Sequence, residues 1–185
     1  MSNSTAAAVL TTTDLAEAIR AVRILLAISG GSPEVDYDAR ITSPDVLARV
    51  LHVLPDPDWW SMEGPERGSA KAGDDPAGCL PIHLSHWGAP DSAEPFIAAL
   101  GPEPAALRWD LDGWPAVPEA QLELITEKYA YLTLTVNSRD LYQDEPSQDH
   151  TVHVHVRSEI ETDRIGWLAD RISGRFTGRT ESAPF

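Results

Sequence analysis

The amino-acid sequence predicts an α+β fold, in which an antiparallel sheet carries one helix from each end of the chain. Two segments, "YAYLTLTV" (129–136) and "HTVHVHV" (150–156), alternate apolar and polar residues as half-buried strands do. Segments near both termini instead repeat apolar residues every three to four positions, which is typical of amphipathic helices. With 185 residues, 42% of them hydrophobic, the chain is expected to form a single domain over 1–185.

In the first third of the chain, a helix, a strand and a second helix are expected in that order. The helix lies in 11–31, with Thr13 or Asp14 as its N-cap and Gly30–Gly31 ending it. The segment "EVDYDARIT" alternates as a half-buried strand does. The segment "SPDVLARVLHVLP" (43–55) then predicts a helix, because Ser43 can cap it and a proline occupies the first helical position.

Two segments are predicted to lack long regular elements. Residues 1–10 are small and polar, so they are expected to form a disordered tail unless a partner orders them. Residues 55–118 contain 11 of the 15 prolines and five of the six tryptophans, which predicts an ordered but irregular insertion with one short helix ending at Gly101. The tryptophans are candidate interaction residues, because tryptophan is enriched in interface hot spots: Trp59, Trp60, Trp87, Trp109 and Trp114.

The last third is expected to contain a hairpin followed by a helix. Residues 129–137 and 150–157 should pair as antiparallel strands across a long loop. The preceding segment, 119–128, fits a helix and a strand equally well. A final amphipathic helix is predicted from an apolar stripe formed by Ile165, Leu168, Ile172 and Phe176.

The net charge of −15 restricts the classes of partner. A protein of this charge repels phosphate backbones and anionic lipid, so neither nucleic acid nor a membrane is expected as a partner. The only cysteine, Cys79, excludes an intramolecular disulfide. The N-terminus has no signal-peptide pattern and no apolar run is long enough to span a bilayer, so a cytoplasmic or virion location is expected.

Histidines in "HTVHVHV" raise the question of a metal site. Since Val152, Val154 and Val156 should face the core, His153 and His155 should lie together on the opposite face, exposed to solvent or to a partner. The spacing from His153 through Glu159 to Gly166 matches part of the first cupin metal motif, but the second motif has no place in the 19 residues that remain. A polar strand face is therefore preferred over a metal site.

Other candidate chemistry is similarly incomplete. Cys79, His83 and His86 match no common zinc spacing, and Asp110 with Asp112 fits a solvated turn. Neither a phosphate-binding glycine loop nor a nucleophile elbow is present in the sequence. The sequence therefore predicts a protein that is not an enzyme, with no catalytic, cofactor or metal residues.

The final segment "HTVHVHVRSEIETDRIGWLADRISGRF", together with the first helix, resembles tail-terminator or tail-completion proteins of long-tailed phages. The resemblance implies a structural subunit of a ring that caps the tail tube, and therefore a homo-oligomer or particle subunit. Two alternatives remain open. One is an acidic immunity-type protein, or another protein-binding module, that binds a basic partner. The other is a small metal-dependent enzyme that uses His153 and His155.

Overall fold

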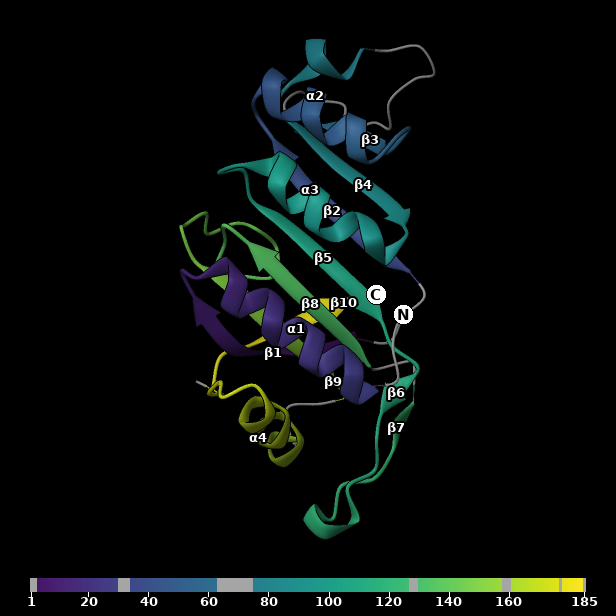
Figure 1. Cartoon of the computed structure of the whole chain (residues 1–185), viewed down its shortest axis with the longest axis vertical. Coiled ribbons are helices and arrows are strands. Elements are labelled where there is room, and N and C mark those ends of the chain that lie inside the picture. Colours follow the sequence, from purple (N-terminus) through teal and green to yellow (C-terminus); the bar gives the residue numbers. More distant parts are fainter. Residues whose placement is uncertain are drawn as a thin grey trace.

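An eight-stranded, fully antiparallel sheet forms the centre of the protein (Figure 1), with strands in the order β10-β1-β9-β8-β5-β2-β4-β3. The structure, a computed structural model, describes residues 3–29, 34–62, 75–126, 130–157, 161–176 and 178–184. The strands of the sheet are β1 (Asn3–Thr12), β2 (Val35–Ile41), β3 (Asp58–Ser61), β4 (Ile82–Gly88), β5 (Ala105–Asp110), β8 (Tyr131–Val136), β9 (His150–Val156) and β10 (Thr180–Pro184). A separate short ribbon pairs β6 (Gly113–Trp114) with β7 (Ile125–Thr126). The predicted α+β class with an antiparallel sheet is confirmed.

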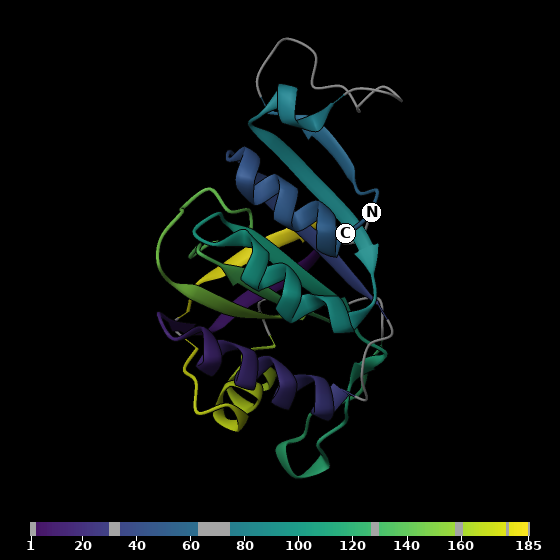
Figure 2. The ribbon, with the colours of Figure 1, turned by 45° about the horizontal axis from the view of Figure 1, so that its top comes forward.

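Helices cover one face of this sheet, as Figures 1 and 2 show for α1, α2 and α3. The helices are α1 (Leu15–Ser29), α2 (Pro44–Val53), α3 (Ala93–Leu100) and α4 (Thr162–Arg171), with 3-10 turns η1 (Pro76–Cys79), η2 (Pro90–Ser92) and η3 (Pro118–Ala120). Side chains of all four α-helices share one apolar core with the strands, represented by Leu25, Leu47, Phe96 and Leu168. Phe96 contacts Tyr37 of β2 edge to face, with ring centroids 5.1 Å apart.

Local sequence signals place the first two helices as expected. The Asp14 carboxylate accepts a hydrogen bond from the Ala16 amide at 2.9 Å, so it caps α1. The Ser43 hydroxyl caps α2 by accepting from the amide of Val46 at 3.5 Å. The expected end of the first helix at Gly30–Gly31 lies outside the described residues.

The predicted hairpin is also confirmed. Strands β8 and β9 pair antiparallel, with Leu132 opposite Val154 and Thr133 opposite His153. All three valines of β9 are buried in the core, as the alternation predicts.

The N-terminal segment is not a disordered tail, and this prediction is wrong. Residues 3–12 form β1, which lies inside the sheet between β9 and β10. Ala7 and Val9 enter the apolar core, whereas Ala6 is buried on the opposite face against Leu141. Because both faces of this strand are covered, small side chains fill it, and the alternation that marks a half-buried strand is missing.

Residues 55–118 do not form an irregular insertion; this prediction is also wrong. They supply β3, β4 and β5 to the main sheet, together with α3. In the described part of this segment, the prolines fall between these elements or in first turns. Pro81 precedes β4, Pro104 precedes β5, and Pro95 lies in the first turn of α3. A proline at such a position removes no hydrogen bond from the element, so a high proline content is compatible with regular structure.

The remainder of the chain differs from expectation at two places. The ambiguous segment 119–128 forms part of η3 and then β7, so in its described part it is neither a long helix nor a strand of the main sheet. The last helix, α4, ends at Arg171, before Phe176 of the predicted apolar stripe, and strand β10 follows in a segment for which no element was predicted. The Gly174 amide closes the helix end by donating to the Ala169 carbonyl at 2.9 Å.

Candidate functional site on the polar face of the sheet

Polar side chains line the face of the sheet that faces away from the helices. The strand register places Asp36 of β2 opposite Arg108 of β5, and Arg108 opposite Thr133 of β8. Thr133 in turn lies opposite His153 of β9. Residues directly opposite each other in antiparallel strands share a face, so these four side chains form one polar row across four strands.

The β8–β9 loop (residues 137–149) folds over this face and is organised by Asp140. The Asp140 carboxylate accepts hydrogen bonds from the backbone amides of Tyr142, Asp144 and Glu145, at 3.1, 2.9 and 2.7 Å. Burial alone would raise the pKa of Asp140, but the amides of Asp144 and Glu145, with the Ser138 hydroxyl, hold it below its usual value. The loop therefore has a defined shape, built around one ionised carboxylate.

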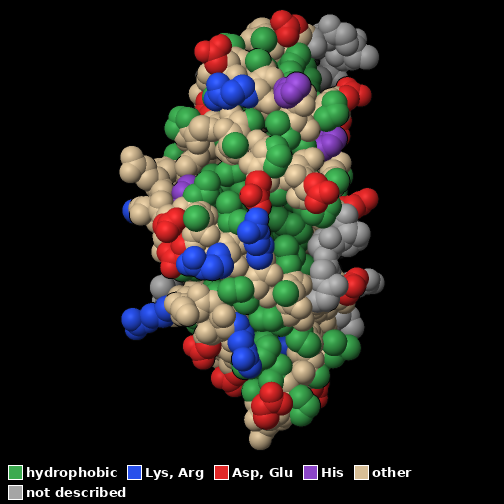
Figure 3. Space-filling view, viewed as in Figure 1, with side chains coloured by type: hydrophobic (Ala, Val, Ile, Leu, Met, Phe, Trp, Pro, Cys, Tyr) green, Lys and Arg blue, Asp and Glu red, His purple; other side chains and the backbone are tan. Residues whose placement is uncertain are grey.

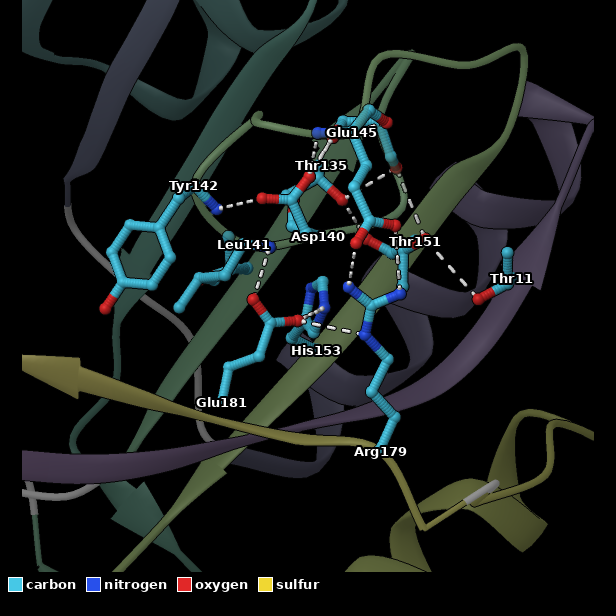
Figure 4. A network of polar contacts seen from close by, with 12 residues as sticks. Thr11, Thr135, Asp140, Leu141, Tyr142, Glu145, Thr151, His153, Arg179 and Glu181 are labelled. Carbon is cyan, nitrogen blue, oxygen red and sulfur yellow. Dashed lines mark hydrogen bonds and ion pairs between the residues drawn. The ribbon is translucent and has the colours of Figure 1, made fainter.

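Several hydrogen bonds and ion pairs fasten the loop to the sheet. The Gln143 side-chain amide donates to Asp38 Oδ1 at 2.5 Å, and the Arg40 guanidinium donates to Asp144 Oδ1 at 2.6 Å. Nearby in the loop, the Leu141 amide donates to Glu181 Oε2 of β10 at 3.0 Å (Figure 4). The Leu141 side chain is buried against alanines of β1 and β10.

Beneath the loop lies a hollow of about 350 Å³, called here the loop-covered hollow. Its walls come from β2, β4, β5, β8 and the loop: Asp36, Asp38, Arg40, His83, Ala106, Arg108, Thr133, Leu141, Tyr142, Gln143 and Asp144. Three buried atoms of these residues have no hydrogen-bond partner in the described part of the chain: Asp36 Oδ1, Arg40 Nε and Gln143 Oε1. Buried polar atoms are nearly always paired, so such a group indicates a site for water or a ligand.

Arg108 occupies the centre of the polar row. Its guanidinium lies 2.9 Å from Asp110 and 3.4 Å from Asp36, between the rings of Trp87 and Tyr131 at 5.2 and 5.5 Å. Burial raises the pKa of Asp36, and the nearby Asp38 and Asp110 charges act in the same direction, whereas Arg108 and Ser85 lower it. The pKa of Asp36 therefore lies above its ordinary value.

His155 lies fully buried beside this row. Its Nδ1 lies 3.2 Å from the Ser4 hydroxyl, and its Nε2 lies 2.9 Å from the Thr133 hydroxyl. Burial lowers the pKa of His155 well below its ordinary value, and charge on His153 and on Arg108 lowers it further. The imidazole is therefore neutral, and hydroxyl groups occupy both of its nitrogens.

His153 is fully buried as well, which corrects the expectation that both histidines face solvent or a partner. Both lie on the face opposite the valines, where Ser4 of β1 contacts His155 and Glu181 of β10 contacts His153. Leu141 of the loop packs on the same side against alanines of β1 and β10. His153 Nε2 lies 3.6 Å from Glu181 Oε1, which Arg179 also approaches at 3.5 Å (Figure 4). Burial would raise the pKa of Glu181, but His153, the Leu141 amide and Arg179 together hold it below its usual value.

The other residues singled out from the sequence are dispersed. His83 joins the hollow, where it contacts Asp38 and stacks on Trp60 with ring centroids 4.3 Å apart, whereas Cys79 lies in η1. Within the described ranges, no group of three or more histidine, cysteine, aspartate and glutamate side chains could hold a metal ion. Glu159 lies outside the described residues.

The five candidate tryptophans occupy three kinds of environment. Trp109 and Trp114 are buried in the core, and the Trp114 ring nitrogen donates to the His155 carbonyl at 2.7 Å. Trp59 and Trp60 on β3 are half-buried, and Trp87 on β4 is 48% exposed. Their role in binding a partner stays a prediction. Of the five tryptophans, only those on β3 and β4 are accessible enough to contact a partner.

Sequence reasoning missed most of the hollow. The polar residues of "DYDAR" were recognised as one strand face, but Arg108 and Gln143 were not singled out. The alternation in "ALRWD" is the signal that could have identified β5 and its polar face.

Among the described residues, no helix combines the length and apolar character needed to cross a bilayer. No family model, no curated protein and no solved structure matches this chain.

Proposed function

We propose that this protein is a non-enzymatic, acidic binding module that forms a one-to-one complex with a basic protein in the cytoplasm, in the manner of an immunity protein. The observation that carries this proposal is the internal use of its basic side chains. Arginines at five positions pair with carboxylates of the same chain: Arg23, Arg40, Arg108, Arg139 and Arg179. The net charge is −15, so acidic side chains far outnumber the basic side chains that can pair with them within the chain.

The distribution of charge supports the same proposal. On the helix-covered face in Figure 3, basic side chains are scattered among acidic ones and do not gather into one patch. A strongly negative protein attracts a basic partner and accelerates encounter, and salt weakens that attraction. The affinity of such a complex should therefore fall as ionic strength rises.

The tail-terminator role expected from the sequence stands as a second proposal. It is supported by the two ends of the sheet: within the described chain, β3 and β10 each pair with one strand only. Unpaired strand edges are ready surfaces for contact with another subunit. Against it, the N-terminal segment, which was expected to be disordered unless a partner ordered it, is a strand of the protein's own sheet.

Native mass measurements distinguish these roles. The chain would be measured alone and after co-expression with each protein encoded next to it in the genome. The binding-module proposal expects a monomer alone, and a one-to-one complex with a basic neighbour that weakens between 0.05 and 0.5 M salt, roughly the range over which screening strengthens. A ring of the chain alone would instead support the tail-terminator role. Failure of every neighbour to form the complex would contradict the binding module, and stoichiometric zinc with an activity lost on chelation would contradict a non-enzymatic role.

A further inference from the structure

We propose that the loop-covered hollow binds one cationic nitrogen group, a guanidinium or an ammonium, with Asp36 Oδ1 and Gln143 Oε1 as its acceptors. The preferred source is a side chain of the basic partner, and this choice of source rests on the proposed function. The binding chemistry itself does not rest on it, because it follows from the residues that line the hollow.

The first step is the orientation of Gln143. This side chain is only 2% exposed, and its Nε2 donates to Asp38 Oδ1 at 2.5 Å. Only an N–H group can pair with that carboxylate, so exchanging the amide oxygen and nitrogen would place two acceptors together. Gln143 Oε1 is therefore left without a partner in the described part of the chain, as an acceptor that needs a donor.

The second step is the balance of charge. Three carboxylates line the hollow: Asp36, Asp38 and Asp144. Two guanidinium groups, of Arg40 and Arg108, face them, so the carboxylates outnumber the guanidinium groups by one. His83 contacts one of the three carboxylates, that of Asp38. A cation is therefore favoured in the hollow over an anion.

The third step is the size of the hollow and the nature of its walls. A volume of about 350 Å³ lies at the lower end of the range for small-ligand sites, roughly 300–1,000 Å³. Ala106, Leu141 and Tyr142 provide apolar surface along which the methylene stem of an arginine or lysine can lie. Arg40 Nε, the remaining unpaired atom, is a donor that suits a carbonyl next to that stem.

The first experiment uses small probes on the isolated chain. Binding of Nα-acetyl-arginine methylamide would be followed by NMR through the Gln143 side-chain amide, against the isosteric neutral citrulline probe and against agmatine, a free small cation. The arginine probe should bind saturably, and citrulline about tenfold or more weakly, because hydrogen bonds between charged groups are the stronger ones. Tighter binding of agmatine than of the arginine probe would overturn the protein side chain as the source. No saturable binding would leave only water in the hollow and overturn the proposal.

The second experiment uses a matched pair of variants, Asp36→Asn and Asp110→Asn. Each removes one unit of charge and one carboxylate partner of Arg108, but only Asp36 lines the hollow. Asp36→Asn should weaken the arginine probe about tenfold or more, whereas Asp110→Asn should change it by less than about twofold. Equal losses would show a general field effect and overturn the site. Because these measurements need no partner, their failure is distinguishable from failure of the one-to-one complex.

Discussion

Lowering the pH from 7 to 5 should destabilise this protein through His155. The imidazole is buried, neutral and held by two hydroxyl groups, and burial, followed by charge on His153 and Arg108, holds its pKa well below the ordinary value. The unfolded chain takes up a proton near pH 6.5, whereas the folded chain does not. Stability is therefore fully present above that pH and is lost as the pH falls below it.

The magnitude follows from linkage. With an unfolded pKa of about 6.5 and no protonation of the folded state, one histidine removes about 1.9 kcal/mol of unfolding free energy between pH 7 and pH 5. Burial also lowers the pKa of His150, so that residue adds a loss of the same sign. The carboxyl groups with lowered pKa values, Asp140 and Glu181, affect stability mainly below their ordinary pKa values of 3.8 and 4.5, outside this interval.

Urea unfolding at pH 7, 6 and 5 measures this effect. His155→Gln should lose about 1.9 kcal/mol less than the wild type between pH 7 and pH 5, because the titrating group is gone. The control is His52→Gln, on an exposed position of α2, which should retain the wild-type dependence. The comparison uses the change with pH within each variant, so a constant cost of the substitution cancels. An unchanged pH dependence in His155→Gln would refute the reasoning.

Two further predictions concern the N-terminal strand and two glycines, Gly166 inside the last helix and Gly174 just after it. A Cβ at Gly174 would overlap the carbonyl oxygen of Val9, so Gly174→Ala should cost about 1–3 kcal/mol, whereas Gly166→Ala, with open space inside α4, should gain about 0.5–1 kcal/mol in urea unfolding. Equal effects of the two substitutions on stability would contradict the close approach of Gly174 to the Val9 carbonyl. Deleting residues 1–11 should abolish cooperative folding in circular dichroism, because β1 separates β9 from β10; a native-like spectrum would show that the strand is dispensable.

The sequence predicts an element well where one of its faces is buried. The valines of β9 and the alternation of β2 are visible as patterns of period two, and Ser43 marks the start of α2 directly. Strand β1 has no such pattern, because Ala6 and Ala7 are buried on opposite faces. The prolines of residues 55–118 lie mostly at boundaries between helices and strands. Composition alone does not show whether a proline marks such a boundary or interrupts a helix or strand.

The site was largely beyond prediction for a different reason. Its polar row joins Asp36, Arg108, Thr133 and His153, which come together only through the register of four strands. A single sequence contains the polar face of each strand but not the pairing between strands distant along the chain. The short strand β10 places Glu181 next to His153, but its sequence "TESAP" shows no periodic pattern that would predict a strand.

The acceptors in the hollow depend on a chain of contacts that begins on β4. His83 contacts Asp38 Oδ2, which leaves the other oxygen of that carboxylate to accept from Gln143. This bond leaves Gln143 Oε1 as an acceptor without a partner in the described part of the chain, and it also holds the loop against the sheet. The same loop donates to Glu181 through Leu141, so its fit to the sheet requires β10, and β10 is paired to β1. The proposed binding site on β2 and β5 is therefore linked through the loop to both terminal strands, although neither of them lines the hollow.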